Sequence, residues 1–485
     1  MMRNYAMALS HLRRLALSAS VTLVFLLTAP SFGPGAEASS PADGNPVLTP
    51  MESPLLQAEW YRPGIFPPDD YQDAEYFLDG FARTYPDGET RVPYRTRIFV
   101  RRPADPATFS GTVLVEFNNP TLDQTATYPE SWQEIHRRRH AYVMVSGHAA
   151  GVEFLKQRNP VRYDSLDHPG NDYAYDMYSQ AGWVLKYPGE HDPLAGLRGG
   201  PAIKLIGIGQ SGSGSGLVQY IVRGALRDAA AAGVYDALMP GDSGGPVTLH
   251  SPGPPGDEIA VPVLHHMAES QWRPNAPEHP LYKPWWIAGA SHKDHWNLSA
   301  TPGFVLVTIG ADALKELAPQ DGQYGELGGV GIRTGLPPLA VAIPLPAECL
   351  PANMFPKRYA IHAAIRRLDT WIRTSVSVPD SPEFEHDESG LVRDADGNVL
   401  GGLRLAPIDV PVAGYDGESC SPWGLTTPFS DQELRSRYPT HDDYMTKLSE
   451  AIDANVADGF LLPEDADDLL GRADAAWFRW GVVQP

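Results

Sequence analysis

The sequence predicts an α/β fold in which a mostly parallel sheet is flanked by helices. Short β-branched or apolar runs alternate with longer mixed stretches over residues 111–309. Strands that alternate with helices of about 10–15 residues are typical of βαβ units, whose strands run parallel. Apolar residues make up 42% of the 485 residues, which is enough for a well-buried core. The Pro-rich C-terminal third changes character, so we expect additions after the sheet.

The expected elements follow one another along the chain. Strands are predicted at 111–117, 141–145, 203–208, 235–239 and 261–266, with weaker patterns at 285–288 and 304–309. Helices are predicted at 131–140, 175–186, 216–229 and 359–376. A turn at 394–398, between two short apolar runs, predicts a hairpin in the C-terminal additions.

The N-terminal segment is typical of a removable export signal. Three arginines accompany an apolar run over 15–29, and a small-x-small cleavage site ends at Ala38. The run is too short to span a bilayer comfortably, which argues against a stable membrane anchor after cleavage. We therefore expect a secreted or periplasmic protein with a signal peptide (1–38), a flexible leader (39–56) and one domain with a C-terminal extension (57–485).

Charge and cysteine content narrow the class further. The formal net charge of −21 repels nucleic-acid phosphates and anionic lipid headgroups, so we expect a small-molecule partner and no nucleic acid. The only cysteines are Cys349 and Cys420. Because export favours oxidation and the count is even, we predict a disulfide between them.

The most informative segment is Gly209-Gln210-Ser211-Gly212-Ser213, which joins a predicted strand to a predicted helix. This is the context of a nucleophile elbow, in which a strained turn holds a serine hydroxyl out at the edge of the sheet. Small residues are needed two positions before and after the serine, because larger side chains would collide with the strand and helix. Ser211 is therefore the candidate nucleophile, and the amide of Gly212 is the candidate first donor of an oxyanion hole.

Two other patterns lie in the same region. Glycines over 207–212 match the G-x-G-x-x-G fingerprint of dinucleotide-binding loops, but the acidic residue near the required distance, Asp228, falls inside a predicted helix. Residues 241–246 spell out the nucleophile signature of trypsin-like proteases around Ser243. The trypsin-like fold is all-β, and its catalytic histidine and aspartate precede the serine in the chain. Because strands alternate with helices around residues 241–246 here, we interpret this segment as a glycine-rich turn.

A serine nucleophile needs a histidine base that is oriented by a carboxylate, in the chain order serine, acid, histidine. Glu269 lies just past the strand at 261–266, and His292 follows the strand at 285–288. We predict that these two complete the triad. The rival bases are His265, His266, His279 and His295, and the rival acids are Asp257 and Asp294. No dense ligand cluster supports a metal site. Acyl transfer by such a triad needs no metal or organic cofactor, so we expect none.

The second oxyanion donor is expected after an early strand. Asn119 follows the strand at 111–117, and its main-chain amide is our choice. Pro120 has no N–H and is excluded. Asn118 and Thr121 stay open as alternatives.

With these residues in hand, the chain resembles a family of bacterial exported α/β-hydrolase-domain proteins over nearly its whole mature length. The nucleophile segment is similar to the family's Gly-x-Ser-x-Ser-Gly form, and residues 288–294 are similar to its histidine segment. Residues 261–263 and Glu269 resemble its acid-bearing strand, although Gln271 stands where an aspartate is expected. The resemblance implies the α/β-hydrolase fold and hydrolysis of a carboxylic ester by Ser211, Glu269 and His292. The competing interpretation is a non-catalytic exported binding protein on the same fold.

Overall fold

The computed structural model describes residues 45–51, 70–86, 88–121, 123–243, 258–274, 276–294, 349 and 352–477. The predicted signal peptide (1–38) and the predicted strand at 304–309 lie outside these residues. Among the described helices, none combines the length and the apolar character that crossing a bilayer requires.

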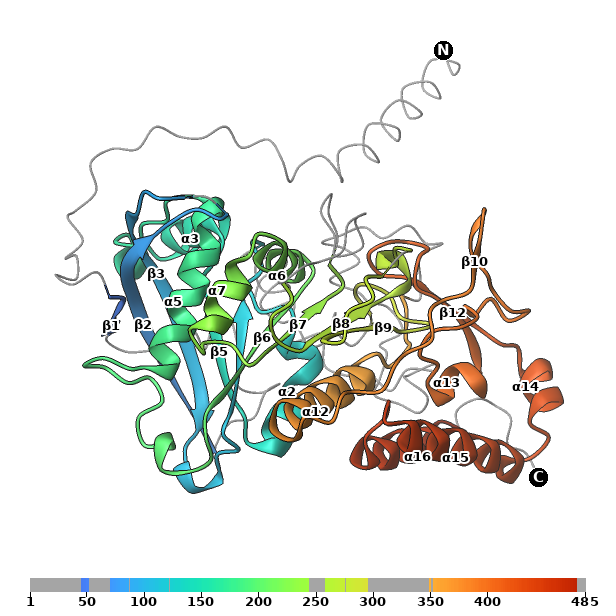
Figure 1. The fold of residues 1–485 in the computed structure, drawn as a ribbon. Coiled ribbons are helices and arrows are strands. Elements are labelled where there is room, and N and C mark those ends of the chain that lie inside the picture. Colours follow the sequence, from blue (N-terminus) through green and yellow to red (C-terminus); the bar gives the residue numbers. More distant parts are fainter. Residues whose placement is uncertain are drawn as a thin grey trace, which may run out of the picture. The chain divides into compact units, whose positions relative to one another are not determined.

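A nine-stranded sheet forms the centre of the described chain, in the order β1-β2-β3-β5-β4-β6-β7-β8-β9 (Figure 1). Its strands are β1 (Val47–Pro50), β2 (Tyr71–Ala82), β3 (Val92–Pro103), β4 (Thr112–Phe117), β5 (Ala141–Val145), β6 (Lys204–Gln210), β7 (Ala237–Gly241), β8 (Val263–Met267) and β9 (Tyr282–Trp286). The pairs β1–β2, β2–β3 and β3–β5 are antiparallel, and every later pair is parallel. The prediction of a mostly parallel sheet is confirmed.

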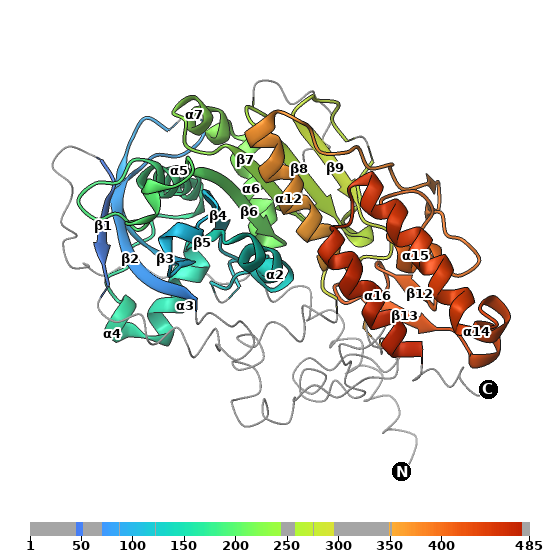
Figure 2. The same ribbon diagram turned by 90° about the horizontal axis from the view of Figure 1, so that it is seen from below.

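Helices cover both faces of the sheet (Figure 2). The described helices are α2 (Tyr128–Arg138), α3 (Ala149–Arg158), α4 (Pro160–Tyr163), α5 (Ala174–Lys186), α6 (Gly212–Val222), α7 (Ala225–Ala231), α12 (Arg358–Thr374), α13 (Ala406–Asp409), α14 (Asp431–Arg437), α15 (His441–Asp458) and α16 (Pro463–Trp477), of which the last four belong to the C-terminal additions. Successive side chains of a strand point to opposite faces. Accordingly, Val113 and Val115 belong to the apolar cluster under α5, α6 and α7, whereas Leu114 belongs to the cluster under α2 and α12.

Two of the predictions differ from the structure by more than a shifted end. The helix expected at 216–229 begins earlier and is divided into α6 and α7 at Gly224, whose φ of +80° stops a right-handed helix. The leader predicted as flexible contains β1, which pairs with β2 at the edge of the sheet. The other described helices and strands that were predicted are present, with ends shifted by a few residues.

The C-terminal additions contain the predicted hairpin. Arg393 and Val399 form an antiparallel bridge across the turn, and the N–H of Asp394 donates to the carbonyl of Asn398. Two further small pairings are β10 (His386–Asp387) with β11 (Gly390–Leu391) and β12 (Ala413–Asp416) with β13 (Leu425–Pro428). Residues from α12, α15 and α16 share one apolar cluster with the sheet, so this section is part of the same core.

Candidate active site

Ser211 stands on a strained turn between β6 and α6. Its backbone φ of 64° and ψ of −126° lie in a region that residues other than glycine rarely adopt. The main-chain N–H of Ser211 donates to the carbonyl of Gly241 at 3.0 Å, which ties the turn to β7. A Cβ on Gly209 would lie 2.8 Å from Cβ of Ser213, so the glycine two positions before the serine is sterically required. The local geometry is that of a nucleophile elbow.

His292 is the histidine that reaches this serine. Its Nε2 lies 2.9 Å from Oγ of Ser211. Burial lowers the pKa of His292 to about 3, an effect that Asp242 opposes and two nearby lysines reinforce, so the ring is neutral near pH 7. A neutral ring can accept the serine proton, which is what a general base must do.

Glu269 bonds to the histidine loop but makes no hydrogen bond to the imidazole. It begins a short 3-10 turn, η5 (Glu269–Gln271), and its side chain is buried. Oε1 accepts from the N–H of Gly289 at 2.6 Å, and Oε2 accepts from the N–H of Gly417 at 2.9 Å and from Arg393 at 2.8 Å. Burial raises the pKa of Glu269 to about 7 against the opposing charge of Arg393. Nδ1 of His292 has no hydrogen-bond partner among the described residues.

The predicted direct contact between Glu269 and His292 is therefore absent from the structure. The physical reason is that two main-chain N–H groups and the Arg393 guanidinium hold both carboxylate oxygens elsewhere. What remains is an indirect link, because Gly289 precedes the histidine by three positions in the same loop.

Asp242, which follows β7, is the carboxylate that the sequence analysis missed. Its side chain is fully buried, and its oxygens accept from Gln210 at 2.7 Å, from Lys357 at 2.8 Å and from the N–H of Ala268 at 2.7 Å. The available signal was an aspartate three positions after the predicted strand at 235–239. The match of its neighbours to a protease signature drew attention to Ser243 instead.

The oxyanion candidates lie next to each other. Gly212 is the first residue of α6, and the leading N–H groups of a helix have no partner within the helix. The main-chain N–H of Asn119 donates to the carbonyl of Gln124 at 2.9 Å, so the predicted main-chain role does not fit. Its side chain is better placed, because Nδ2 lies 3.4 Å from where a Cβ on Gly212 would stand. Oδ1 accepts from the N–H of Thr121 at 3.0 Å and fixes the orientation of the amide.

The rival residues occupy other positions. His265 bonds to Ser243 at 2.8 Å and to Tyr282 at 2.8 Å, away from the elbow serine. His266 is buried on β8 with its ring at the position that a Cβ on Gly241 would take. Asp228, the acid of the dinucleotide interpretation, lies in α7 and pairs with Arg83 at 2.9 Å. The remaining candidates are His279, which accepts from the N–H of Leu281, the buried Asp294, and His295 and Asp257, which lie outside the described residues.

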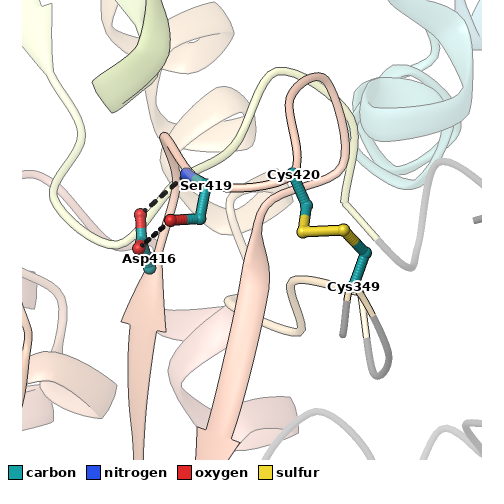
Figure 3. The surroundings of a disulfide bond; sticks show 4 residues. All are labelled: Cys349, Asp416, Ser419 and Cys420. Atoms are coloured by element: carbon teal, nitrogen blue, oxygen red, sulfur yellow. Dashed lines mark hydrogen bonds between the residues drawn. A yellow bond between two sulfur atoms is a disulfide. The ribbon is translucent and has the colours of Figure 1, made fainter. Parts of the chain in front are cut away.

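A C-terminal loop that bonds to the histidine loop carries one half of the predicted disulfide (Figure 3). Cys349 and Cys420 are bonded with their Cα atoms 5.6 Å apart, which confirms that prediction. Within the loop, Ser419 donates to the carboxylate of Asp416 through its main-chain N–H and its hydroxyl. The carbonyl of Pro422 accepts from the N–H of Lys293 at 2.8 Å. The disulfide therefore fixes a segment that holds the main chain beside His292.

The comparison with protein-family models agrees with this architecture. The family model described as an alpha/beta hydrolase domain matches residues 42–471. Among solved structures, the esterase Est22 is similar at 15% identity and a TM-score of 0.28, with 44% of this chain and 69% of that chain covered. A dienelactone hydrolase from Anabaena variabilis is similar at 14% identity and a TM-score of 0.25, with 41% and 74% covered. The comparison with curated proteins found no match. The family match spans most of the sequence, and the chain belongs to the alpha/beta hydrolase domain family.

Proposed function

We propose that the protein is an exported serine hydrolase that cleaves a carboxylic ester, with Ser211 as nucleophile and His292 as general base. The observation that carries this proposal is the distance of 2.9 Å between Oγ of Ser211 and Nε2 of a neutral His292, on a turn strained to φ 64°. A serine hydroxyl is a weak nucleophile until such a base accepts its proton. Strain at the serine further supports a functional role, because strained backbone is concentrated at functional sites.

The reaction proceeds in two halves. Oγ of Ser211 attacks the ester carbonyl carbon while its proton moves to Nε2 of His292. The imidazolium then donates that proton to the departing alkoxide, and the acyl group stays on Ser211. In the second half, His292 takes a proton from water, the hydroxide attacks the acyl carbon, and the carboxylic acid leaves as Ser211 regains its proton.

Two donors stabilise the negative oxygen that forms at each tetrahedral stage. One is the N–H of Gly212 at the start of α6, and the other is the side-chain amide of Asn119 beside it. Each positioned donor of this kind contributes on the order of 10²–10³-fold to the rate. Glu269 acts at a distance by fixing the turn at Gly289 that leads to the histidine.

Export and substrate class rest on other features. The N-terminal charge and apolar pattern together with the disulfide support a secreted or periplasmic location. The net charge of −21 suits neutral or cationic esters better than anionic ones.

Covalent labelling with a fluorophosphonate probe tests the proposal. Labelling of the wild type that is lost in Ser211→Ala and His292→Ala, and kept in Ser243→Ala, is the expected result. Ser243 is a matched control because it too is hydrogen-bonded to a histidine, His265, at 2.8 Å. An unlabelled wild type would favour a non-catalytic binding protein, and loss of labelling only in Ser243→Ala would reassign the nucleophile.

A further inference from the structure

A buried charge cluster that includes Asp242, the residue after β7, contacts the main chain of the histidine loop. Nζ of Lys357 is 2.8 Å from the carboxylate of Asp242 and 3.1 Å from that of Glu130, and all three side chains are at most 1% exposed. The same ammonium donates to the carbonyls of Ser291 and His292 at 3.1 and 3.3 Å. One buried cation thus joins two carboxylates to the main chain of the histidine loop.

Gln210 makes a parallel connection from the other side. Its Nε2 donates to Asp242 at 2.7 Å and to the carbonyl of His292 at 3.3 Å. Gln210 also immediately precedes Ser211 in the elbow. Because two donors are each shared between the Asp242 carboxylate and the His292 carbonyl, the carboxylate lies beside the histidine loop and is locked to the nucleophile turn.

Burying these three charged side chains costs free energy of folding. Burying ions removes their hydration, and a well-packed apolar group in the same space is often as stable or more stable. Stability alone therefore does not account for a buried aspartate and lysine at this place. A role in the chemistry of the adjacent histidine does account for them.

We propose that Asp242, held by Lys357 and Gln210, is the positioning carboxylate for His292 and stabilises the imidazolium that forms when Ser211 loses its proton. This inference rests on the proposed function and names the acid of that same site. Asp242 accepts no proton in the cycle: the serine proton moves to Nε2 of His292 and later to the leaving alkoxide.

The charges around the histidine agree with this assignment. Asp242, Lys293 and Lys357 act directly on the imidazole, and Glu130 and Asp294 act on the two lysines. Although burial opposes its ionisation, Lys357 holds the pKa of Asp242 well below its usual range, so this carboxylate stays charged whenever His292 works. Glu269 is less suited, because burial raises its pKa to about 7.

The test compares Asp242→Asn with Glu269→Gln by the rate of fluorophosphonate labelling and by kcat and KM for p-nitrophenyl acetate. Asp242→Asn should lower the labelling rate and kcat by roughly 10³-fold or more with little change in KM, as expected when an imidazolium loses its carboxylate. Glu269→Gln should lower the labelling rate and kcat far less than Asp242→Asn does. Ser243→Ala, next to Asp242 in the chain, is the control and should label like the wild type.

A double variant guards against misfolding, because Asp242→Asn removes one of the two carboxylates that pair with the buried Lys357. Asp242→Asn/Lys357→Met removes both charges and should label as slowly as Asp242→Asn. Lys357→Met alone should move the acid limb of the labelling rate to higher pH, because a cation near His292 has been removed. A merely structural lysine would leave that limb unmoved.

Three outcomes would overturn the inference. Labelling at the wild-type rate in Asp242→Asn or in the double variant would do so while leaving the proposed function intact. A fall in labelling rate in Glu269→Gln as large as that in Asp242→Asn would also overturn the assignment of Asp242 and leave the proposed function intact. Absence of Ser211-dependent labelling in the wild type would overturn the proposed function and this assignment together.

Discussion

Oγ of Ser211 and Nε2 of His292 lie 2.9 Å apart, although 81 positions separate the two residues. Ser211 follows β6 and His292 follows β9, and two further strands, β7 and β8, lie between these in the sheet. The histidine therefore reaches the serine only because its loop extends across the carboxyl ends of both intervening strands. Whatever holds that loop controls the proposed chemistry.

The pH dependence of activity should reflect the burial of His292. The base must be unprotonated to work, and burial lowers its pKa to about 3, from an ordinary value near 6.5. As pH falls, activity should therefore persist well below 6.5 and be lost only on approach to the lowered pKa. The measurement is kcat/KM for p-nitrophenyl acetate against pH, with circular dichroism at each pH to exclude unfolding. An acid limb centred at 6.5 or above would contradict the expectation.

The second oxyanion donor can be assigned by two substitutions at Asn119. Asn119→Ala should lower kcat by about 10²–10³-fold, because a positioned donor is lost. Asn119→Asp keeps an oxygen that can accept from Thr121 but places a negative charge where the oxyanion forms, so its loss should be at least as large. Steady-state kinetics with thermal melts as a folding control measure both. Near-wild-type kcat in Asn119→Asp would show that the side-chain amide is not a donor.

Backbone strain at Ser211 should lower the free energy of unfolding, so relieving it should stabilise the fold. Ser211→Gly relieves a φ of 64° and should stabilise the fold by about 1 kcal/mol while abolishing labelling. Ser211→Ala keeps a Cβ and so keeps the strain, which makes it the matched inactive control. Chemical denaturation of the two variants should separate them. Equal stability of Gly and Ala variants would mean that the turn is unstrained.

Removing the disulfide should affect both stability and labelling. The bridge spans 71 positions, and the chain-entropy model assigns about 4 kcal/mol to a loop of that length. Cys349→Ser/Cys420→Ser should therefore lower the free energy of unfolding by that order. The labelling rate should also fall, because the anchored loop bonds to the main chain at Lys293. A double variant with reduced stability but unchanged labelling would separate the bridge from the site.

The elbow, the histidine loop and the disulfide could be predicted from the sequence because each depends on a local pattern or a forced pairing. The acid could not. Arg393, which lies 124 positions after Glu269, donates to the Glu269 carboxylate. No pattern near Glu269 in the sequence indicates this partner. Asp242 was overlooked because its neighbours in the sequence match the protease signature of an unrelated fold.

The antiparallel edge of the sheet was missed because charged side chains interrupt its apolar pattern. Glu75 on β2 and Arg97 on β3 are both buried and paired with each other, so a charged position there points inward. The buried Asp79 of β2 likewise pairs with the partly buried Arg95 of β3 at 2.6 Å. Pattern reading assigns such residues to solvent, and only the pairing across strands reveals that they belong to the interior.

The dependence of the histidine loop on Lys357, Arg393 and Gly417 sets an order of events during synthesis. A chain that ends soon after His292 holds the nucleophile, the base and the parallel strands, yet it lacks the groups that bind Asp242 and Glu269. The nascent polypeptide should therefore stay inert until its last third has packed. Under the proposed function, competence for hydrolysis therefore depends on three groups that follow the base by 65 to 125 positions in the chain.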